Sequence, residues 1–319
     1  MPVDEFALID RFVRHFPRRG PGLSLGPGDD CALLRPAPGR ELCVTTDTVR
    51  QGAHFGPRFG AADVGHKALA VNLSDLAAMG ARPRWFLAAI ELPARVAPTF
   101  VDGLGRGMAA LARKHQCLLA GGNLCRGPGV AVTITAIGDI PTGRVTRRDG
   151  LRAGDLLVVT GSLGLAALGL RTLRRSRRDR GVAAAERAQL RPEPRVAAGL
   201  AARGLATAGI DISDGLSQDL GHLCAASGCG AEVWAERLPT SSGVAARRDW
   251  LTLCLSGGED YELLLGVAAR SWPKLRRRLG RSGTPAVVIG RALARPGLWL
   301  ADGPGGPVKR LPPRGFNHF

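Results

Sequence analysis

Short acidic motifs constrain this chain more than any other feature of its sequence. The chain has only 27 Asp and Glu residues against 44 Lys and Arg residues, yet eight of the acids fall in five short segments flanked by glycine or apolar residues. These segments are residues 28–30, 44–47, 72–75, 211–215 and 257–260. A carboxylate beside buried strand residues is costly unless a cation pairs with it. Arginine could serve, but many oxygens from distant segments suit Mg²⁺ better, and Mg²⁺ usually arrives with a phosphate.

Length and composition predict a globular chain with two domains. At 319 residues, two domains are favoured over one, and a hydrophobic content of 45% is ample for their cores. The seven cysteines are odd in number and form no Cys-x-x-Cys pair, which argues against a zinc site or a disulfide framework. We expect small core residues in a reducing compartment. No signal peptide and no apolar run of membrane-spanning length are recognised, so the expected location is the cytoplasm.

The basic excess gives a formal net charge of +17. Much of it lies in two arginine-rich runs at residues 171–180 and 274–281. Such runs can bind nucleic acid, or they can form the solvated faces of helices. Neither run contains Tyr, Phe or Trp for stacking on bases, which favours the solvated faces. A basic surface would still attract anionic nucleotides.

The hydrophobic pattern predicts an α/β (α+β) fold with two mixed-sheet domains. A turn-rich, charged stretch near residues 140–155 places the domain boundary between domains 1–150 and 151–319. In the first domain we expect helices at 5–17, 62–80 and 99–115, and strands at 41–46, 85–92, 116–120 and 130–137. In the second we expect a strand at 156–160, helices from 163, near 195–203 and from 215, and strands at 231–234, 261–267 and 286–290.

The usual nucleotide-binding signatures are missing. The sequence has no G-x-x-x-x-G-K-[ST] loop, no H-R-D or D-F-G motif, and no correctly spaced G-x-G-x-x-G. Residues 211–215 are similar to a nucleophile elbow, but Asp211 stands where the elbow has glycine. Ser213 is therefore a poor candidate for an acylating nucleophile.

Residues 211–215 more readily combine capping with metal binding. If a helix opens at Gly215, Asp211 closes the preceding strand and Asp214 sits at the helix entry. There Asp214 could cap the helix and also reach a metal ion. The alternative is a pure cap, with Asp211 in a salt bridge. Caps alone, however, do not explain five acidic motifs.

Other segments offer oxygen ligands or glycine-rich turns. Thr45, Thr46 and Asp47 place hydroxyls and a carboxylate at a strand end, which suits Mg²⁺, although threonine is also an ordinary strand residue. Residues 121–123 form a loop in our prediction, either binding phosphate through backbone amides or making a simple tight turn. The glycines before Glu259 would permit a turn that points it at a ligand.

Taken together and in order, the segments are similar to one known family. They are residues 28–34, 45–55, 65–83, 121–123, 160–164, 211–223, 255–264, 289–291 and 315–319. The set resembles the thiamine-monophosphate kinase family of the aminoimidazole-ribonucleotide synthetase superfamily. The resemblance implies phosphorylation of thiamine monophosphate by ATP, assisted by several Mg²⁺ ions. It also implies a homodimer formed through the N-terminal sheet and an active site between the two domains.

The resemblance assigns a role to individual residues of this chain. Asp47, Asp75 and Asp214 would be the catalytic carboxylates. Gly122, Asn123, Arg148 and Ser213 would contact ATP, while His54, Glu259 and Phe316 would contact thiamine monophosphate. The implied metal ligands are Asp30, Thr45, Thr46, Asp47, Asp75, Asn123, Asp211 and Asp214.

Two positions depart from the family pattern. Asn123 stands where many members have Asp, so we expect one metal ion to bind more weakly, and Leu165 replaces a common acidic residue. The nearest alternative is a member of the same superfamily with another acceptor, such as a selenophosphate synthetase. The absence of Cys and Lys before Asp29 argues against that enzyme. A basic nucleic-acid-binding protein on an inactive kinase fold is the alternative from another class, and the intact acids argue against it.

Overall fold

The computed structural model describes residues 5–27, 31–174 and 182–317. The chain divides into two compact units. The N-terminal unit comprises Met1–Leu76 and Arg82–Thr142, and the C-terminal unit comprises Ala77–Ala81 and Gly143–Phe319. Each unit contains its own sheet and is described by itself.

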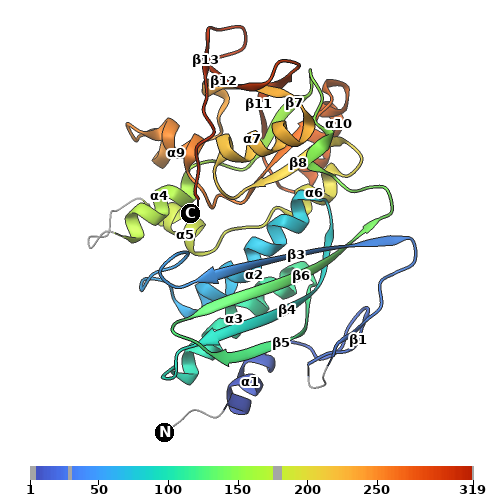
Figure 1. The fold of residues 1–319 in the computed structure, drawn as a ribbon, viewed down its shortest axis with the longest axis vertical. Helices are drawn as coiled ribbons and strands as arrows, with labels where there is room; N and C mark the ends of the chain where they lie inside the picture. Colours follow the sequence, from blue (N-terminus) through green and yellow to red (C-terminus); the bar gives the residue numbers. More distant parts are fainter. Residues whose placement is uncertain (1–4, 28–30, 175–181, 318–319) are drawn as a thin grey trace. The chain divides into compact units, whose positions relative to one another are not determined.

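The N-terminal unit is built on a four-stranded sheet in the order β3-β6-β4-β5. Its strands are β3 (Arg40–Arg50), β6 (Ala131–Pro141), β4 (Arg82–Leu92) and β5 (Leu118–Arg126). Strand β6 pairs antiparallel with both β3 and β4, whereas β4 and β5 are parallel. Helices α2 (Ala61–Ala78) and α3 (Pro98–His115) cover one face of this sheet, behind the strands in Figure 1. The boundaries predicted for both helices are confirmed to within two residues.

Glycines let α2 and α3 approach each other closely. A Cβ atom on Gly107 would lie 1.9 Å from the Ala62 carbonyl oxygen, and one on Gly65 would lie 2.1 Å from the Leu104 carbonyl oxygen. Neither helix could hold its place with any other residue there, because both obstacles are backbone atoms. This packing fixes the N-terminal part of α2 against α3.

Small elements lie at the margins of the N-terminal sheet. Helix α1 (Glu5–Val13) packs against α3, and a two-stranded sheet pairs β1 (Leu23–Leu25) with β2 (Leu33–Leu34). Leu23 packs with Trp85 and Ala120 on the face opposite α2 and α3. Beyond that cluster, in the part of the unit that the structure describes, the face is exposed, and Val44 on it is 63% exposed.

The C-terminal unit contains a seven-stranded sheet in the order β13-β12-β9-β11-β7-β10-β8. Among the described residues, neighbouring strands of this sheet pair antiparallel, except β12 and β9, which are parallel. The strands are β7 (Leu156–Thr160), β8 (Ala206–Ile212), β9 (Gly230–Trp234), β10 (Glu262–Val267), β11 (Ala286–Leu293), β12 (Gly297–Ala301) and β13 (Val308–Arg310).

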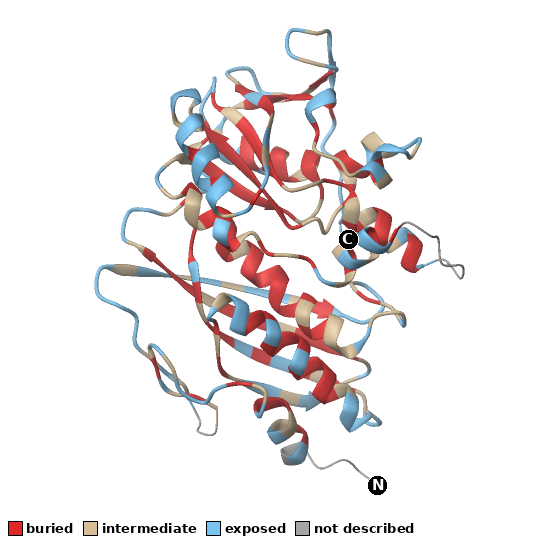
Figure 2. Cartoon of the chain, turned by 180° about the vertical axis from the view of Figure 1, so that it is seen from behind, coloured by how far each residue is buried: buried red, intermediate tan, exposed pale blue. Residues whose placement is uncertain are grey.

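The helices of this unit are short. They are α4 (Leu165–Leu173), α5 (Ala183–Leu190), α6 (Val196–Ala202), α7 (Leu216–Ser227), α8 (Ser242–Ala245), α9 (Trp250–Ser256) and α10 (Trp272–Arg281), with single 3₁₀ turns η1 (Arg148–Gly150), η2 (Ala235–Arg237) and η3 (Ala269–Ser271). Helix α7 and the strands beneath it form the buried core, seen in red in Figure 2. The core relies on Leu, Val, Ile and Ala, as the low aromatic content predicts.

The two arginine-rich runs differ in what the structure describes. In the second run, α10 buries Leu275 and Leu279 and exposes Lys274, Arg276 and Arg277, as a solvated helix face does. Only residues 171–174 of the first run are described; the rest of it lies outside the described residues. The cysteines are free thiols, and Cys117, Cys224 and Cys254 are buried.

Two details of the predicted N-terminal unit are wrong. Residues 121–123 do not form a loop, because they pair with Leu87, Ala88 and Ala89 and continue β5. Strand β3 also extends to Arg50, so Asp47 lies inside the strand instead of after its end. Both errors have one cause: pairing with β4 and β6 carries the strands through Gly121, Gly122, Asn123 and Asp47, which have little strand preference of their own.

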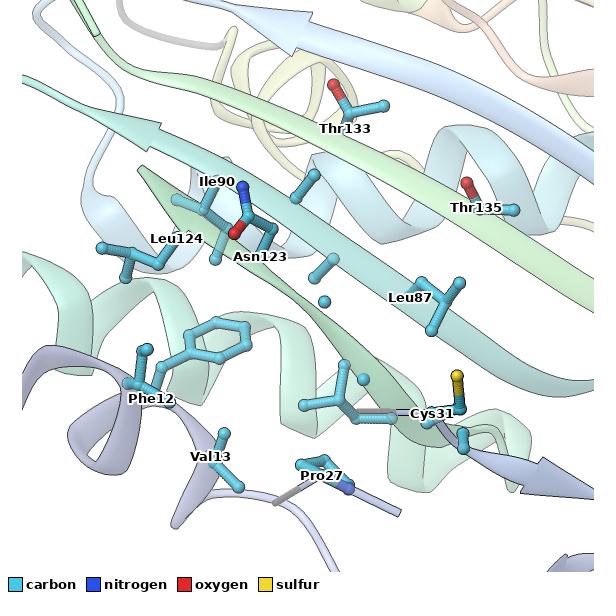
Figure 3. Close-up of a pocket in the computed structure, with 18 of the residues that line it drawn as sticks. Phe12, Val13, Pro27, Cys31, Leu87, Ile90, Asn123, Leu124, Thr133 and Thr135 are labelled. Carbon is cyan, nitrogen blue, oxygen red and sulfur yellow. The ribbon is translucent and has the colours of Figure 1, made fainter. Parts of the chain in front are cut away.

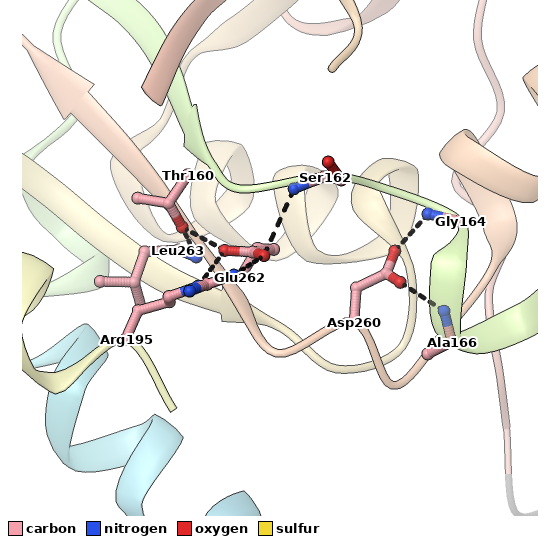
Figure 4. Close-up of polar contacts among 8 residues, drawn as sticks. All are labelled: Thr160, Ser162, Gly164, Ala166, Arg195, Asp260, Glu262 and Leu263. Atoms are coloured by element: carbon pink, nitrogen blue, oxygen red, sulfur yellow. Dashed lines mark hydrogen bonds and ion pairs between the residues drawn. The ribbon is translucent and has the colours of Figure 1, made fainter. Parts of the chain in front are cut away.

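A buried ion pair joins three segments of the C-terminal unit (Figure 4). The Glu262 carboxylate on β10 accepts two hydrogen bonds from Arg195, at 2.6 Å from Nε and 2.5 Å from Nη2. It also accepts one from the Thr160 hydroxyl at 2.7 Å. Because the Glu262 side chain is only 5% exposed, removing the arginine would leave a buried charge without its counterion.

Asp260, two residues earlier, fixes the start of α4 (Figure 4). Its carboxylate accepts hydrogen bonds from the amides of Gly164 at 2.6 Å and Ala166 at 3.1 Å. Burial of the carboxylate raises the pKa of Asp260 to about 7, against the opposing effect of these amides, and the charge of Glu262 raises it further.

We predict that Arg195→Met destabilises the protein by about 3 kcal/mol or more, the range typical of a broken buried pair. The measurement is urea unfolding followed by far-UV circular dichroism. Arg171→Met is the matched control, since the Arg171–Asp249 pair is 45% and 46% exposed. The control should change the free energy of unfolding by about 1 kcal/mol or less. Equal losses in the two variants would contradict the prediction.

The raised pKa of Asp260 predicts a dependence of stability on pH. Between the unfolded pKa and the folded value of about 7, the folded state binds more protons than the unfolded state. The free energy of unfolding should therefore fall as the pH rises from 5.5 to about 8. In Asp260→Asn this fall should be smaller, as urea titrations at several pH values would measure. An identical pH profile in both proteins would show that Asp260 does not titrate in this range.

Candidate functional site

A tight turn connects β8 to α7 in the C-terminal unit. Asp211 lies near the end of β8, is 3% exposed, and pairs in register with Leu263 of β10. Gly215 precedes α7 with φ +130°, and a Cβ atom there would lie 2.9 Å from the Ser256 carbonyl carbon. Only glycine tolerates this backbone angle together with this contact. The turn therefore has one conformation, which places Ser213 and Asp214 at the start of α7.

Asp219, which sequence reasoning missed, holds this turn. Its Oδ2 accepts hydrogen bonds from the amides of Asp214 at 3.1 Å and Gly215 at 3.0 Å. The predicted capping by Asp214 is thus wrong: the N-cap is Gly215, and an acid in the first turn of α7 accepts the amide bonds. Burial raises the pKa of Asp219 to about 7, and the neighbouring charge of Asp214 adds to the rise. The signal in the sequence was an acid four residues after Gly215, in a helix that also carries Leu216, Leu220 and Leu223.

Two further segments meet this turn. The Phe316 amide donates to the Asp214 carbonyl at 3.1 Å, and the Glu259 amide donates to the Ser213 carbonyl at 2.7 Å. The Gln218 amide bridges the Asp214 carboxylate at 3.0 Å and the Phe316 carbonyl at 3.1 Å. The structure thus brings together Ser213, Asp214, Glu259 and Phe316, four residues that the sequence analysis selected from three separate segments.

The segment that carries Glu259 has a strained backbone. Glu259 has φ +67° and Tyr261 has φ +51°, in the left-handed region that residues other than glycine rarely adopt. The Tyr261 amide donates to the Ile212 carbonyl at 2.9 Å, and the Asp260 carboxylate is tied to α4. Such strain persists only where surrounding bonds enforce it, and it is concentrated at functional sites.

In the N-terminal unit, Thr45 and Asp75 form an oxygen pair. The Thr45 hydroxyl donates to Asp75 Oδ2 at 2.7 Å, which joins β3 to α2 on the helix-covered face of the sheet. Asp47, two residues after Thr45 on the same strand, lies on the same face and is exposed. These are hard oxygen donors within one short stretch of strand and helix.

Thr46 and Asn123 lie on the other face of the sheet. Thr46 pairs in register with Thr135, whose hydroxyl donates to that of Thr46 at 3.3 Å. Asn123 pairs in register with Ala89, which in turn pairs with Thr133. Residues paired in register share a face, so Asn123 and Thr46 are on the open face. Within one sheet, the structure does not bring them together with Thr45 and Asp75.

His54 follows β3 in a short loop. Its Nδ1 accepts a hydrogen bond from the Arg50 amide at 3.1 Å, which assigns the proton of the neutral ring to Nε2. Lys67 of α2 supports this loop: it is 1% exposed, donates to the His54 carbonyl at 3.1 Å and lies 5.4 Å from the Phe59 ring centre. Sequence reasoning missed Lys67, whose signal is a lysine inside an otherwise apolar stretch of helix.

The remaining predicted site residues are more dispersed. Arg148 is exposed in η1, and its carbonyl accepts a bond from Ser227 at 2.7 Å, beside the end of α7 opposite to Asp214. Gly122 lies within β5, where a Cβ atom would meet the Ala88 carbonyl oxygen at 2.0 Å. Asp30 lies outside the described residues.

The donor chemistry of both units fits Mg²⁺. Carboxylate and hydroxyl oxygens of Thr45, Asp75 and Asp214 are ligands of the kind that Mg²⁺ takes. Near Asp214, the ligand atoms of Asp214, Asp219 and His222 lie within 4.8 Å of one another. Asp219 is engaged with two amides, however, and an imidazole nitrogen suits Zn²⁺ better. Of these three side chains, the Asp214 carboxylate is therefore the one whose chemistry suits Mg²⁺.

None of the helices described has the length and apolar content needed to cross a membrane.

Comparison with protein families identifies both halves of the chain. Residues 28–140 match the AIR synthase related protein, N-terminal domain, and residues 152–301 match the AIR synthase related protein, C-terminal domain. The thiamine-monophosphate kinase of Salmonella typhimurium is 40% identical over 300 residues, which cover 92% of each chain. That of Escherichia coli K12 is 39% identical over 327 residues, which cover 100% of this chain and 99% of the relative.

Solved structures agree with these relatives. The thiamine-monophosphate kinase of Stenotrophomonas maltophilia superposes with a TM-score of 0.85 at 39% identity, covering 95% of this chain and 98% of the other. A structure described as AaThiL complexed with AMPPCP and TMP has a TM-score of 0.80 at 30% identity, with 91% of each chain covered. The resemblance first seen in the acidic motifs is confirmed: this chain belongs to the thiamine-monophosphate kinase family of AIR synthase related proteins.

Proposed function

We propose that this protein transfers the γ-phosphoryl group of ATP to thiamine monophosphate, which gives thiamine diphosphate and ADP. The observation that carries the proposal is the meeting of Ser213, Asp214, Glu259 and Phe316 at the start of α7. This arrangement offers a carboxylate for a metal–phosphate group beside a carboxylate and an aromatic ring for an organic cation. Such an enzyme needs ATP, and we propose the cytoplasm as its location.

The acceptor determines what the protein must supply. Thiamine monophosphate already ends in an ionised phosphate, so its attack on ATP requires no strong general base. The difficulty is the repulsion between two anions that must come into contact. We assign the metal-holding role to Thr45, Asp47, Asp75, Asp211 and Asp214, with contributions from Asp30, Thr46 and Asn123. Mg²⁺ held there would neutralise charge on the phosphates.

The other residues would bind and orient the two substrates. Arg148 is exposed and can clamp a phosphate of ATP with a charge-assisted bond, and Gly122 and Ser213 would contact the nucleotide. His54 can donate from Nε2 to the phosphate of thiamine monophosphate, because its Nδ1 is occupied by the Arg50 amide. Glu259 balances the positive thiazolium ring, and Phe316, which is 48% exposed, offers its ring as a stacking face.

The direct test is a coupled assay of ADP release with ATP, Mg²⁺ and thiamine monophosphate. Thiamine and a reaction without acceptor serve as controls. Turnover with the monophosphate alone, and thiamine diphosphate as the product, would establish the reaction. ATP binding without turnover would retain the nucleotide site and point to another acceptor within the superfamily.

We predict that Asp75→Asn and Asp214→Asn each lower kcat by about 100-fold or more, because each removes a charge from the metal site. Asp249→Asn is the matched control, since Asp249 is exposed and pairs with Arg171 at 2.6 Å on the surface. The control should keep wild-type turnover. Circular dichroism would verify that all three variants fold. Near-normal turnover in both site variants would remove the metal assignment.

We further propose that the protein is a homodimer formed through the open face of the N-terminal sheet. Leu42, Val44 and Leu87 lie on this face and are 47%, 63% and 37% exposed. A cavity of about 650 Å³ beside β5 extends onto the same face, with Leu87, Asn123, Thr133 and Thr135 among its lining residues (Figure 3). Apolar side chains gathered on an uncovered sheet face are typical of an interface. Pairing of two such faces would also enclose Thr46 and Asn123.

The dimer proposal predicts that Val44→Asp shifts the protein towards the monomer, because a buried charge without a partner opposes association. Sedimentation velocity over a range of concentrations would measure the shift. Val308→Asp is the control, as Val308 is 38% exposed on β13 of the C-terminal unit. A wild type that sediments as a monomer at micromolar concentration would refute the proposal.

A further inference from the structure

Gln189 is a buried residue that contacts the proposed thiamine site. The function proposed above gives it no role. It lies on α5, is 1% exposed, and donates from Nε2 to Glu259 Oε2 at 2.5 Å. Glu259 belongs to the strained segment that meets the Asp211–Gly215 turn. The amide of Gln189 thus anchors the Glu259 carboxylate from α5.

The backbone alone does not fix the Glu259 carboxylate. The left-handed conformation and the bond from the Glu259 amide to the Ser213 carbonyl set the direction in which the side chain leaves the chain. Three side-chain torsions lie between that point and the carboxylate oxygens: the first two have several staggered minima each, and the third is broad and roughly two-fold. A buried hydrogen bond at the end of the side chain selects one of them.

Gln189 is itself held firmly. Helix α5 packs so closely on α4 that a Cβ atom on Gly169 would lie 2.0 Å from the Ala185 carbonyl oxygen and 3.0 Å from Gln189 Cβ. The start of α4 is in turn fixed by Asp260, the residue after Glu259 (Figure 4). The contacts therefore form a closed chain from Glu259 through Asp260, α4 and α5 back to Glu259. A shift of α5 would move the carboxylate.

The chemistry of the glutamine side chain is as informative as its position. An amide donates a hydrogen bond to a carboxylate but brings no positive charge to it. Lysine or arginine could make the same bond and would neutralise it. The other amide atom, Oε1 of Gln189, is buried and has no hydrogen-bond partner among the described residues, an arrangement that native proteins rarely keep without a use.

We propose that Gln189 is a positioning residue that orients Glu259 and preserves its charge for the cationic ring of the substrate. The inference rests on the proposed function, because it takes the thiazolium ring as the partner of Glu259. In this proposal Gln189 contributes to the selection of a cationic acceptor through Glu259. Gln189 itself does not contact the transferred phosphoryl group.

Steady-state kinetics of two Gln189 variants would test the proposal. Gln189→Met keeps the length of the side chain and removes the donor; it should raise KM for thiamine monophosphate about tenfold, the effect of losing one hydrogen bond to a charged group. Gln189→Lys keeps a donor and cancels the charge, and should raise this KM further. KM for ATP should stay within about twofold in both variants, a split that a merely structural role would not produce. Arg187→Met, on an exposed position of the same helix, is the control and should leave both constants unchanged.

A double-mutant cycle with Glu259→Ala separates this inference from the proposed function. If Gln189 acts through Glu259, Gln189→Met should have no further effect on KM in the Glu259→Ala background. An unchanged KM for thiamine monophosphate in Glu259→Ala alone would refute the substrate site. A raised KM in Glu259→Ala, together with a normal KM in Gln189→Met or an effect that persists in the double variant, would refute the positioning role. Thermal melting of each variant would exclude loss of fold, and Gln189→Lys provides the test if Gln189→Met does not fold.

Discussion

The hydrogen bond from the Glu259 amide to the Ser213 carbonyl is the contact on which the candidate site depends. It joins two turns that would otherwise be independent: the turn after β8 and the strained segment before β10. Asp219 holds the first turn through its amides, and Asp260 holds the second through the start of α4. Both anchors are carboxylates with a pKa raised by burial. The site thus contains acids of two kinds, those that fix the backbone, such as Asp219 and Asp260, and those for which we propose a ligand, such as Asp214 and Glu259.

The buried Arg195–Glu262 pair stabilises the strand next to the two turns of the candidate site. Glu262 follows the strained segment by one residue and also accepts the hydroxyl of Thr160 from the neighbouring strand. Because β10 lies between β7 and β8, this pair fixes the strand from which the Glu259 segment emerges. Rigid strands and helices beneath a site allow its side chains to be placed accurately. The position of the strained segment that carries Glu259 therefore depends on the sheet.

The sequence allowed the family, the two-sheet architecture and the approximate positions of the main helices and strands to be predicted, whereas elements such as β1, β2, α5, α9, β12 and β13 were not predicted. Helices such as α2 and α3 could be recognised because their apolar period is a local property. Glycines 121 and 122 were misread as a loop, because the strand there depends on pairing with β4, which the local sequence does not reveal. The roles of Asp219, Lys67 and Gln189 were missed for a related reason. Each acts through a contact with a distant or folded-back segment, and a single buried polar residue in a helical pattern does not indicate its partner.

The docking of the segment around Phe316 on the start of α7 has a consequence for folding. Gln218 and Phe316 are separated by 98 positions in the chain, and Ser217 and Arg314 by 97. Contacts over such separations require the closure of a long loop and usually form late. The turn at Asp214 can form as soon as β8 and α7 are in place. The ring of Phe316 can join it only after the rest of the sheet has formed. On the function proposed above, a half-folded chain would therefore have the metal-binding carboxylate in place before the ring that contacts the organic acceptor, so selectivity for the acceptor would be the last property that the molecule acquires.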